Sequence, residues 1–138
     1  MPVHPHPSDA LFVSAARLFA LLGAVNAFIA VAAGAFGAHG LKKRLAADML
    51  ATFEIGVRYH FYHALGLFAV AWLASQRAPA QGAAGWLMLA GIVVFSGSLY
   101  LLALTGTRWL GAITPIGGLC FLAAWACVAY GAWRWSAA

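Results

Sequence analysis

The sequence predicts an all-α membrane protein whose four transmembrane helices form an antiparallel up-and-down bundle. Of its 138 residues, 64% are apolar and 8% are charged, whereas soluble domains contain about 45–50% apolar and about 25% charged residues. So little charge could not cover the surface of a soluble core of this size. Four apolar stretches with short connections between them predict four helices, and short connections make neighbouring helices reverse direction.

The chain is predicted to contain one domain preceded by a tail. Residues 1–13 are rich in proline and histidine, a composition that favours a flexible tail over a helix. Residues 14–138 are predicted to form a single four-helix transmembrane domain. Its spans are expected at residues 18–38, 59–75, 86–104 and 115–133.

The first span contains no charged residue between Leu18 and Ala38. At a rise of about 1.5 Å per residue, this length crosses a hydrocarbon core about 30 Å thick. Small residues recur along one face of this helix: Gly23, Ala27, Ala30, Gly34 and Gly37. Such a stripe lets another backbone approach closely. The partner is either another helix of this chain or a second copy.

An amphipathic segment is predicted between the first two spans. After the basic triplet at residues 42–44, apolar residues repeat every four positions over 45–58, with polar residues between them. This pattern is typical of a helix lying at the membrane interface. Glu54 and Arg58 stand at i and i+4, the favourable order for a helical ion pair.

The last two spans carry signals of internal packing. Ser96, Ser98 and Tyr100 make the second half of span 86–104 polar, so their hydroxyls are expected to face protein rather than lipid. Thr114 is expected to cap the helix that Pro115 begins. Gly117 and Gly118 allow close helix packing near the start of that last span.

The net charge of +5 does not indicate nucleic-acid binding, because the basic residues lie between apolar stretches, where they contact lipid headgroups and set orientation. Five Lys and Arg residues belong to the connections before the second and fourth spans, and three belong to the termini and the middle connection. This bias places those two connections in the cytoplasm and both termini outside.

Ionisable side chains at membrane depth are costly and therefore mark functional hypotheses. The candidate polar cluster is His39, Glu54, His60 and His63. An antiparallel hairpin would bring the end of the first span, with His39, beside the start of the second, with His60 and His63. Together with a carboxylate, the three histidines could bind zinc or copper, or His39 and one histidine of the second span could hold a haem. Alternatively, they cap a helix or bond to backbone carbonyls and headgroups.

Several blocks of the sequence resemble the domain of unknown function 423 family of small membrane proteins and the related transmembrane protein 256 group. The resemblance spans about residues 17–133 and rests on four blocks: residues 37–40 (Gly-Ala-His-Gly), 59–65 (Tyr-His-Phe-Tyr-His-Ala-Leu), 95–106, and 114–118 leading to Trp125. It implies a four-helix integral membrane protein, located in bacteria in the inner membrane, with no established activity.

The function expected from these observations is that of a non-enzymatic accessory or structural bundle. No nucleophile with an acid–base partner is recognisable in the sequence. Its expected partners are the lipid bilayer and a second copy or a larger membrane complex, with no nucleic acid and no cofactor. The alternative is a protein that binds or conducts a metal ion, haem or proton through the histidine cluster at one membrane face.

Overall fold

A computed structural model describes residues 7–135, and this part of the chain is helical without strands. Four long helices account for nearly all of it. They are α1 (Pro7–Phe36, continued by a π-helical turn, Gly37–Leu41), α2 (Ala47–Ser75), a third helix made of α3 (Gln81–Gly91), a π-helical segment (Ile92–Ser96) and α4 (Gly97–Thr105), and α5 (Thr114–Arg134), preceded by a 3-10 turn (Arg108–Ala112).

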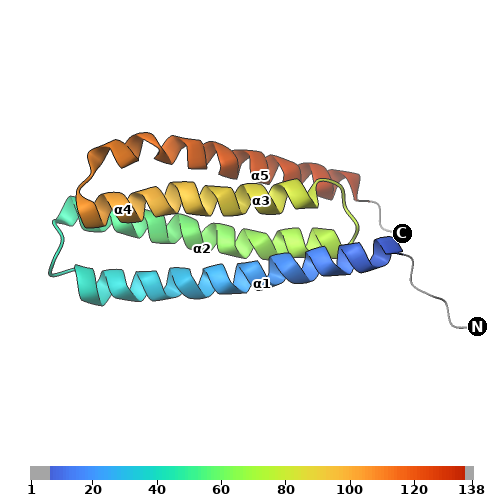
Figure 1. The fold of residues 1–138 in the computed structure, drawn as a ribbon, viewed down its shortest axis with the longest axis horizontal. Coiled ribbons are helices and arrows are strands. Elements are labelled where there is room, and N and C mark those ends of the chain that lie inside the picture. The colour runs from blue at the N-terminus through green and yellow to red at the C-terminus, as the bar shows by residue number, and fades with distance from the viewer. Residues whose placement is uncertain (1–6, 136–138) are drawn as a thin grey trace, which may run out of the picture.

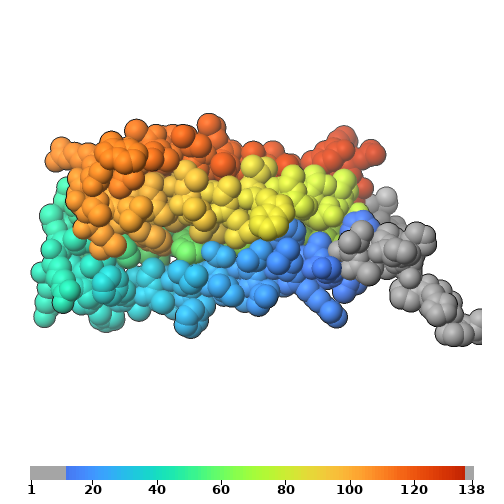
Figure 2. All heavy atoms as spheres, viewed as in Figure 1, coloured from blue at the N-terminus to red at the C-terminus, as the bar shows by residue number. Residues whose placement is uncertain are grey.

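The four helices lie side by side along one long axis (Figure 1). The connections at residues 42–46 and 106–113 lie at one end of the bundle. Both ends of the described chain and the connection at residues 76–80 lie at the other end. On the face shown in Figure 2, α1 and the α3–α4 helix meet and cover most of α2.

Within residues 7–135, three helical stretches are long and apolar enough to cross a membrane: Phe12–Leu41, Gln81–Thr105 and Arg108–Arg134. They contain the spans expected at residues 18–38, 86–104 and 115–133. The expected span 59–75 belongs to α2, which is long enough but too polar to meet the same criterion. The apolar all-helical character predicted from composition is therefore confirmed, and α2 is the most polar of the four long helices.

The predicted interfacial segment 45–58 is wrong as a separate element. From Ala47 onward it is continuous with the rest of α2, because no proline or other break separates the two parts. Phe53 is only 4% exposed, and a β-carbon on Gly37 of the π-helical turn would lie 3.2 Å from its ring. The apolar face that we assigned to lipid headgroups therefore packs against other helices of the bundle.

The predicted tail also extends too far. Helix α1 begins at Pro7, so residues 7–13 are helical, and residues 1–6 lie outside the described part of the chain. A proline is accepted in the first turn because its missing N–H has no intrahelical partner there.

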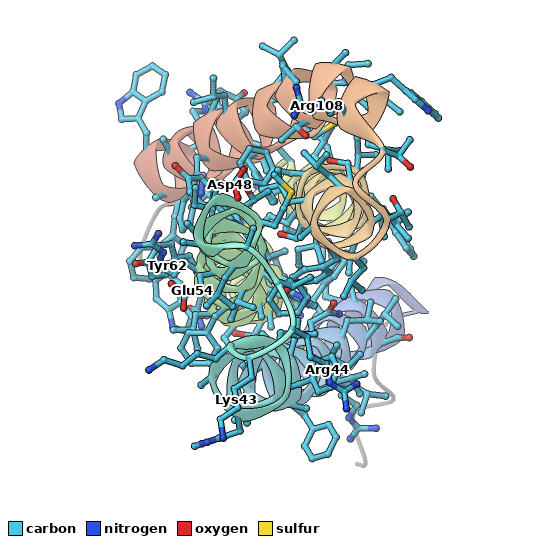
Figure 3. The ribbon with its side chains drawn as sticks, turned by 90° about the vertical axis from the view of Figure 1, so that its left-hand side faces the viewer. Lys43, Arg44, Asp48, Glu54, Tyr62 and Arg108 are labelled. Atoms are coloured by element: carbon cyan, nitrogen blue, oxygen red, sulfur yellow. The ribbon has the colours of Figure 1, made fainter. Side chains whose placement is uncertain are left out.

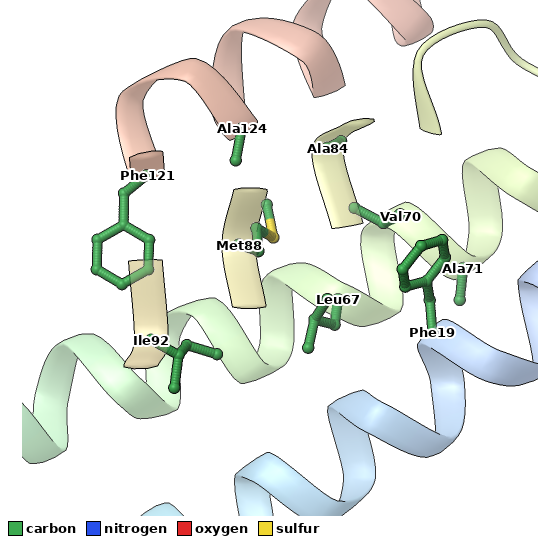
Figure 4. Close-up of a cluster of buried hydrophobic side chains, with 9 residues drawn as sticks. All are labelled: Phe19, Leu67, Val70, Ala71, Ala84, Met88, Ile92, Phe121 and Ala124. Carbon is green, nitrogen blue, oxygen red and sulfur yellow. The ribbon is translucent and has the colours of Figure 1, made fainter. Parts of the chain in front are cut away.

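The largest buried cluster joins all four helices (Figure 4). Its members are Phe19, Leu67, Val70, Ala71, Ala84, Met88, Ile92, Phe121 and Ala124. Phe19 from α1 reaches across to Gly85 on α3, where a β-carbon would collide with its ring. A smaller cluster of Leu41, Phe53 and Ala103 closes the end that carries residues 42–46.

The small-residue stripe of α1 packs against α2 of the same chain. A β-carbon on Gly23 would lie 3.1 Å from the carbonyl oxygen of Ala64, and one on Gly34 would lie 3.3 Å from Val57. Ala30 is fully buried, and Ala27 is partly buried. Of the two partners that the sequence left open, the structure places a helix of this chain on the stripe.

The two glycines near the start of α5 differ. Gly117 lies so close to the third helix that a β-carbon would collide with the backbone nitrogen of Phe95 and stand 2.8 Å from its Cα. At Gly118 the nearest side-chain atom of Phe95 is 3.9 Å from a β-carbon, which is an ordinary contact. Close packing therefore depends on Gly117, and Gly118 borders open space.

Candidate functional site

His60 occupies the middle of α2 and joins three helices. It is 4% exposed, and both of its ring nitrogens have side-chain partners. Nε2 lies 3.1 Å from Oδ1 of Asn26 on α1, and Nδ1 lies 3.2 Å from the hydroxyl oxygen of Tyr100 on α4. The three side chains form one polar chain through the bundle.

The direction of these hydrogen bonds follows from Asn26. Its amide nitrogen donates to the carbonyl oxygen of Leu22 at 2.8 Å, which leaves its amide oxygen to accept. Nε2 of His60 therefore carries the hydrogen. In a neutral imidazole the other nitrogen accepts, and the hydroxyl of Tyr100 donates to it. Each member of the chain therefore has a hydrogen-bond partner within the protein.

His63 lies one turn further along α2 and has different partners. Its Nδ1 is 2.7 Å from the carbonyl oxygen of Tyr59, one turn earlier in the same helix. Its ring stacks on Phe121 of α5, with 3.4 Å between centroids and 10° between planes. The side chain is 5% exposed. His63 therefore connects α2 to α5, whereas His60 connects α2 to α1 and α4.

A groove of about 460 Å³ lies beside His63, between α2 and α5. Aromatic and apolar side chains form nearly all of its lining, and His63 supplies an imidazole. Its lining residues are Tyr59, His63, Phe95, Pro115, Gly118, Leu119, Phe121, Leu122 and Trp125.

The structure does not bring His39 to the other two histidines. His39 is exposed in the π-helical turn after α1. Gly37, in the same turn, packs on Phe53, seven residues before His60 and about 10 Å away along a helix axis. We expected the second helix to begin near Tyr59, but it begins at Ala47. The additional three turns carry His60 to the level of Asn26.

Glu54 is exposed as well. In Figure 3, Glu54 and Tyr62 point from α2 away from the other helices, whereas His60 and His63 are buried. Within residues 7–135, no group of three or more His, Cys, Asp or Glu side chains is arranged to hold a metal ion. The predicted set of His39, His60 and His63 is therefore not assembled.

The hydroxyl groups of the third helix face protein as predicted, since Ser96 is fully buried and Ser98 is 6% exposed. Ser98 Oγ lies 2.8 Å from Oγ1 of Thr114 and links α4 to α5. The predicted cap is wrong: α5 begins at Thr114 itself, and the residue in the cap position, Ile113, makes no side-chain hydrogen bond to this helix end. Ser96 Oγ is the one fully buried polar side-chain atom without a hydrogen-bond partner in the described chain.

The partners of the two buried histidines were only partly visible in the sequence. Tyr100 was predicted to face protein, and Asn26 is a polar residue within the first apolar span, but the contact of both with His60 depends on helix register. The aromatic side chains around His63 gave no signal, because aromatic residues are frequent throughout this chain. Phe121 and Trp125 stand four residues apart and therefore share one face of a helix. This spacing is the sequence feature that could have indicated an aromatic groove wall.

Comparison with known proteins supports the resemblance. The family model described as a protein of unknown function (DUF423) matches residues 33–118. The UPF0382 membrane protein YwdK of Bacillus subtilis (strain 168) is 53% identical over 111 residues, which cover 79% of this chain and 90% of that protein. A UPF0382 membrane protein of Staphylococcus saprophyticus is 47% identical over 118 residues, covering 86% of this chain and 98% of that protein.

No solved structure matches the chain. The family model covers the turn with His39, all of α2 and the third helix, and so includes His60, His63 and Tyr100. The relatives are named as membrane proteins, in agreement with the apolar helices. The chain belongs to the DUF423 family of membrane proteins of unknown function, as its histidine and glycine blocks predicted.

Proposed function

We propose that this protein crosses the bilayer four times and acts as a non-enzymatic bundle, an accessory or structural component of a membrane assembly. The observation that carries the proposal is the chain Asn26–His60–Tyr100, whose polar atoms bond to one another across three helices. Interhelical hydrogen bonds of this kind hold transmembrane bundles together. Side chains engaged in this way are not free to act on a substrate.

The hydrogen bonds among Asn26, His60 and Tyr100 also support a fourth membrane crossing, by α2. The histidines of α2 lower the hydropathy of this helix, but His60 and His63 are buried in contacts with α1, α4 and α5. Polar residues in membrane helices face the bundle interior in this way. The outward side chains of the neighbouring helices are strongly apolar, with Phe28 76% and Leu119 65% exposed. A bilayer around the bundle would cover these surfaces.

The proposed location is the bacterial inner membrane, with residues 42–46 and 106–113 in the cytoplasm and both termini outside. The structure changes the charge count, because Arg58 lies within α2 and not in a connection. Lys42, Lys43, Arg44 and Arg108 remain near the proposed cytoplasmic end, and Arg17, Arg77 and Arg134 lie toward the other end. The triplet next to the first span favours this orientation under the positive-inside rule.

Single-cysteine labelling tests the four crossings. Cys120 and Cys127 are first replaced by alanine, and Lys43→Cys, Gln76→Cys and Trp109→Cys are then made one at a time. In intact spheroplasts, a membrane-impermeant maleimide should label position 76 only, and in inverted vesicles positions 43 and 109 only. Labelling of positions 43 and 76 from the same side would show that α2 does not cross and would overturn the proposal.

An accessory role also requires a partner. Because the glycine stripe of α1 is occupied by α2, a partner or a second copy would use another face, such as the outward side of α2 that carries Glu54 and Tyr62 (Figure 3). Crosslinking in native membranes before solubilisation should give a species heavier than the 14.5 kDa monomer. A Glu54→Leu variant should weaken this species, whereas a Leu119→Ala variant should retain it. Recovery of monomer alone would contradict the accessory role.

A further inference from the structure

We infer that the groove beside His63 binds a membrane-dissolved molecule that carries a hydroxyl group on an aromatic ring, of the phenol or hydroquinone class. Entry of this molecule from the bilayer rests on the proposed crossing by α2, whereas its binding in the α2–α5 groove is measurable in detergent. The protonation of His63 defines what the groove can bind. A backbone carbonyl only accepts hydrogen bonds, so Nδ1, 2.7 Å from the Tyr59 carbonyl oxygen, carries the hydrogen. Nε2 of the neutral ring is then an acceptor.

This acceptor is held in place but not used by the protein. The stack on Phe121 and the bond to Tyr59 fix the ring in two directions. Nε2 has no hydrogen-bond partner among residues 7–135. A fully buried Nε2 would thus be a buried polar atom without a partner, but the one such side-chain atom in these residues is Ser96 Oγ. Nε2 therefore retains accessible surface, and the open space that His63 lines is the α2–α5 groove.

The rest of the groove is suited to a ring. Tyr59 and Phe95 lie with 4.6 Å between centroids, and the indole of Trp125 lies 6.1 Å from the imidazole of His63. These rings offer faces and edges for stacking. The volume of about 460 Å³ falls within the range of small-molecule sites, which are mostly apolar with a few placed polar groups.

The groove opens on the side of the bundle. Leu122 at its mouth is 68% exposed, and Tyr59 and Trp125 are 41% and 42% exposed. A ligand that enters between α2 and α5 would arrive from the bilayer, so its remainder should be apolar. A single acceptor selects a single donor, and a phenolic O–H is a stronger donor than an aliphatic one. An aromatic ring with a hydroxyl group and an alkyl tail suits the ring-lined groove, the single acceptor and the opening on the side of the bundle.

Three probes separate the contributions. They are 4-heptylphenol, its methyl ether 4-heptylanisole, which lacks the donor, and 4-heptylcyclohexanol, which lacks the aromatic ring. Saturation-transfer difference NMR and equilibrium dialysis on the full chain in detergent would measure their binding. The phenol should bind about three- to tenfold more tightly than the ether, as expected for one net hydrogen bond. The cyclohexanol should also bind more weakly than the phenol.

Two variants locate the binding. Gly118→Leu should fill the groove, where a β-carbon meets only ordinary contacts at 3.9 Å, and abolish saturable binding of the phenol. Gly97→Leu is the matched control: a β-carbon there meets nothing within 4 Å, it borders a different groove, and it should leave binding unchanged. His63→Phe keeps a ring against Phe121 but removes the acceptor, so it should bind phenol and ether equally. His39→Ala, at an exposed histidine, should behave as wild type.

Equal affinity of the wild type for phenol and ether would overturn the inference, as would unchanged phenol binding by Gly118→Leu. If His63→Phe does not fold by circular dichroism, the wild-type preference for phenol over ether and the Gly118→Leu result still decide. Equal binding of phenol and cyclohexanol would contradict the aromatic class of ligand.

Discussion

Nε2 of His60 lies 3.1 Å from the amide oxygen of Asn26, and this bond joins α1 to the middle of α2. Asn26 is also near the centre of the apolar stretch Phe12–Leu41. In the proposed membrane arrangement, a polar pair at this depth has no water to replace a lost partner. Its contribution to stability is therefore measurable by removing one side chain at a time.

A double-mutant cycle on Asn26→Ala and His60→Ala should give a coupling free energy of about 0.6–2 kcal/mol, the range for interhelical hydrogen bonds in membranes. His60→Ala alone should lower the free energy of unfolding by about 2–3 kcal/mol, because Asn26 and Tyr100 lose a partner together. His60→Gln, which can retain one bond, should cost less. The measurement is reversible unfolding in mixed detergent micelles.

The control for this cycle is His39→Ala combined with His60→Ala. His39 is exposed and lies in the turn after α1, so its effect should add to that of His60 within about 0.5 kcal/mol. A coupling of zero between Asn26 and His60 would show that the polar chain does not stabilise the bundle.

The sequence predicted the helices better than it predicted their contacts. The expected end at residue 75 coincides with Ser75, and Pro115 lies in the first turn of α5 as expected. The start of α2 was placed too late, because Glu54 and Arg58 suggested lipid headgroups, and a four-residue apolar repeat is the same whether it faces a headgroup or another helix. His60 contacts Asn26 and Tyr100 through the register of α2 on α1 and α4, which one sequence does not contain.

Gly117→Ala should destabilise the protein by about 1–3 kcal/mol, the usual cost of overpacking a core. The added methyl group would collide with the backbone of Phe95, and backbone does not move aside as a side chain can. Gly118→Ala provides the matched control, because its methyl group would meet Phe95 at 3.9 Å. Thermal unfolding in detergent compares the two. Alanine favours a helix more than glycine does, so Gly118→Ala should not lose stability. A loss of equal size in both variants would exclude the contact with Phe95 as its cause.

Ser96→Ala should raise the free energy of unfolding by about 1 kcal/mol. The hydroxyl of Ser96 is fully buried without a partner, so its removal relieves a desolvation cost of about 1–3 kcal/mol and leaves only a small void. Ser98→Ala should have the opposite sign, because Ser98 Oγ bonds to Thr114 at 2.8 Å. A destabilised Ser96→Ala protein would indicate that the hydroxyl has a partner in the membrane, such as a bound water molecule.

Two positions in the connections should respond to glycine exchange with opposite signs. Ala80, just before α3, has a φ of 64°, and Gly106, just after α4, has a φ of 70°. A β-carbon in this left-handed region costs about 1–2 kcal/mol, whereas a new glycine loses up to about 1 kcal/mol through the entropy of the unfolded chain. Ala80→Gly should therefore raise the free energy of unfolding by up to about 1 kcal/mol. Gly106→Ala should lower it by about 1 kcal/mol.

Ala78→Gly is the control, because Ala78 lies in the same connection as Ala80 but has no positive φ. This substitution should only destabilise the protein. A gain in stability at Ala78 equal to that at Ala80 would exclude backbone conformation as the cause.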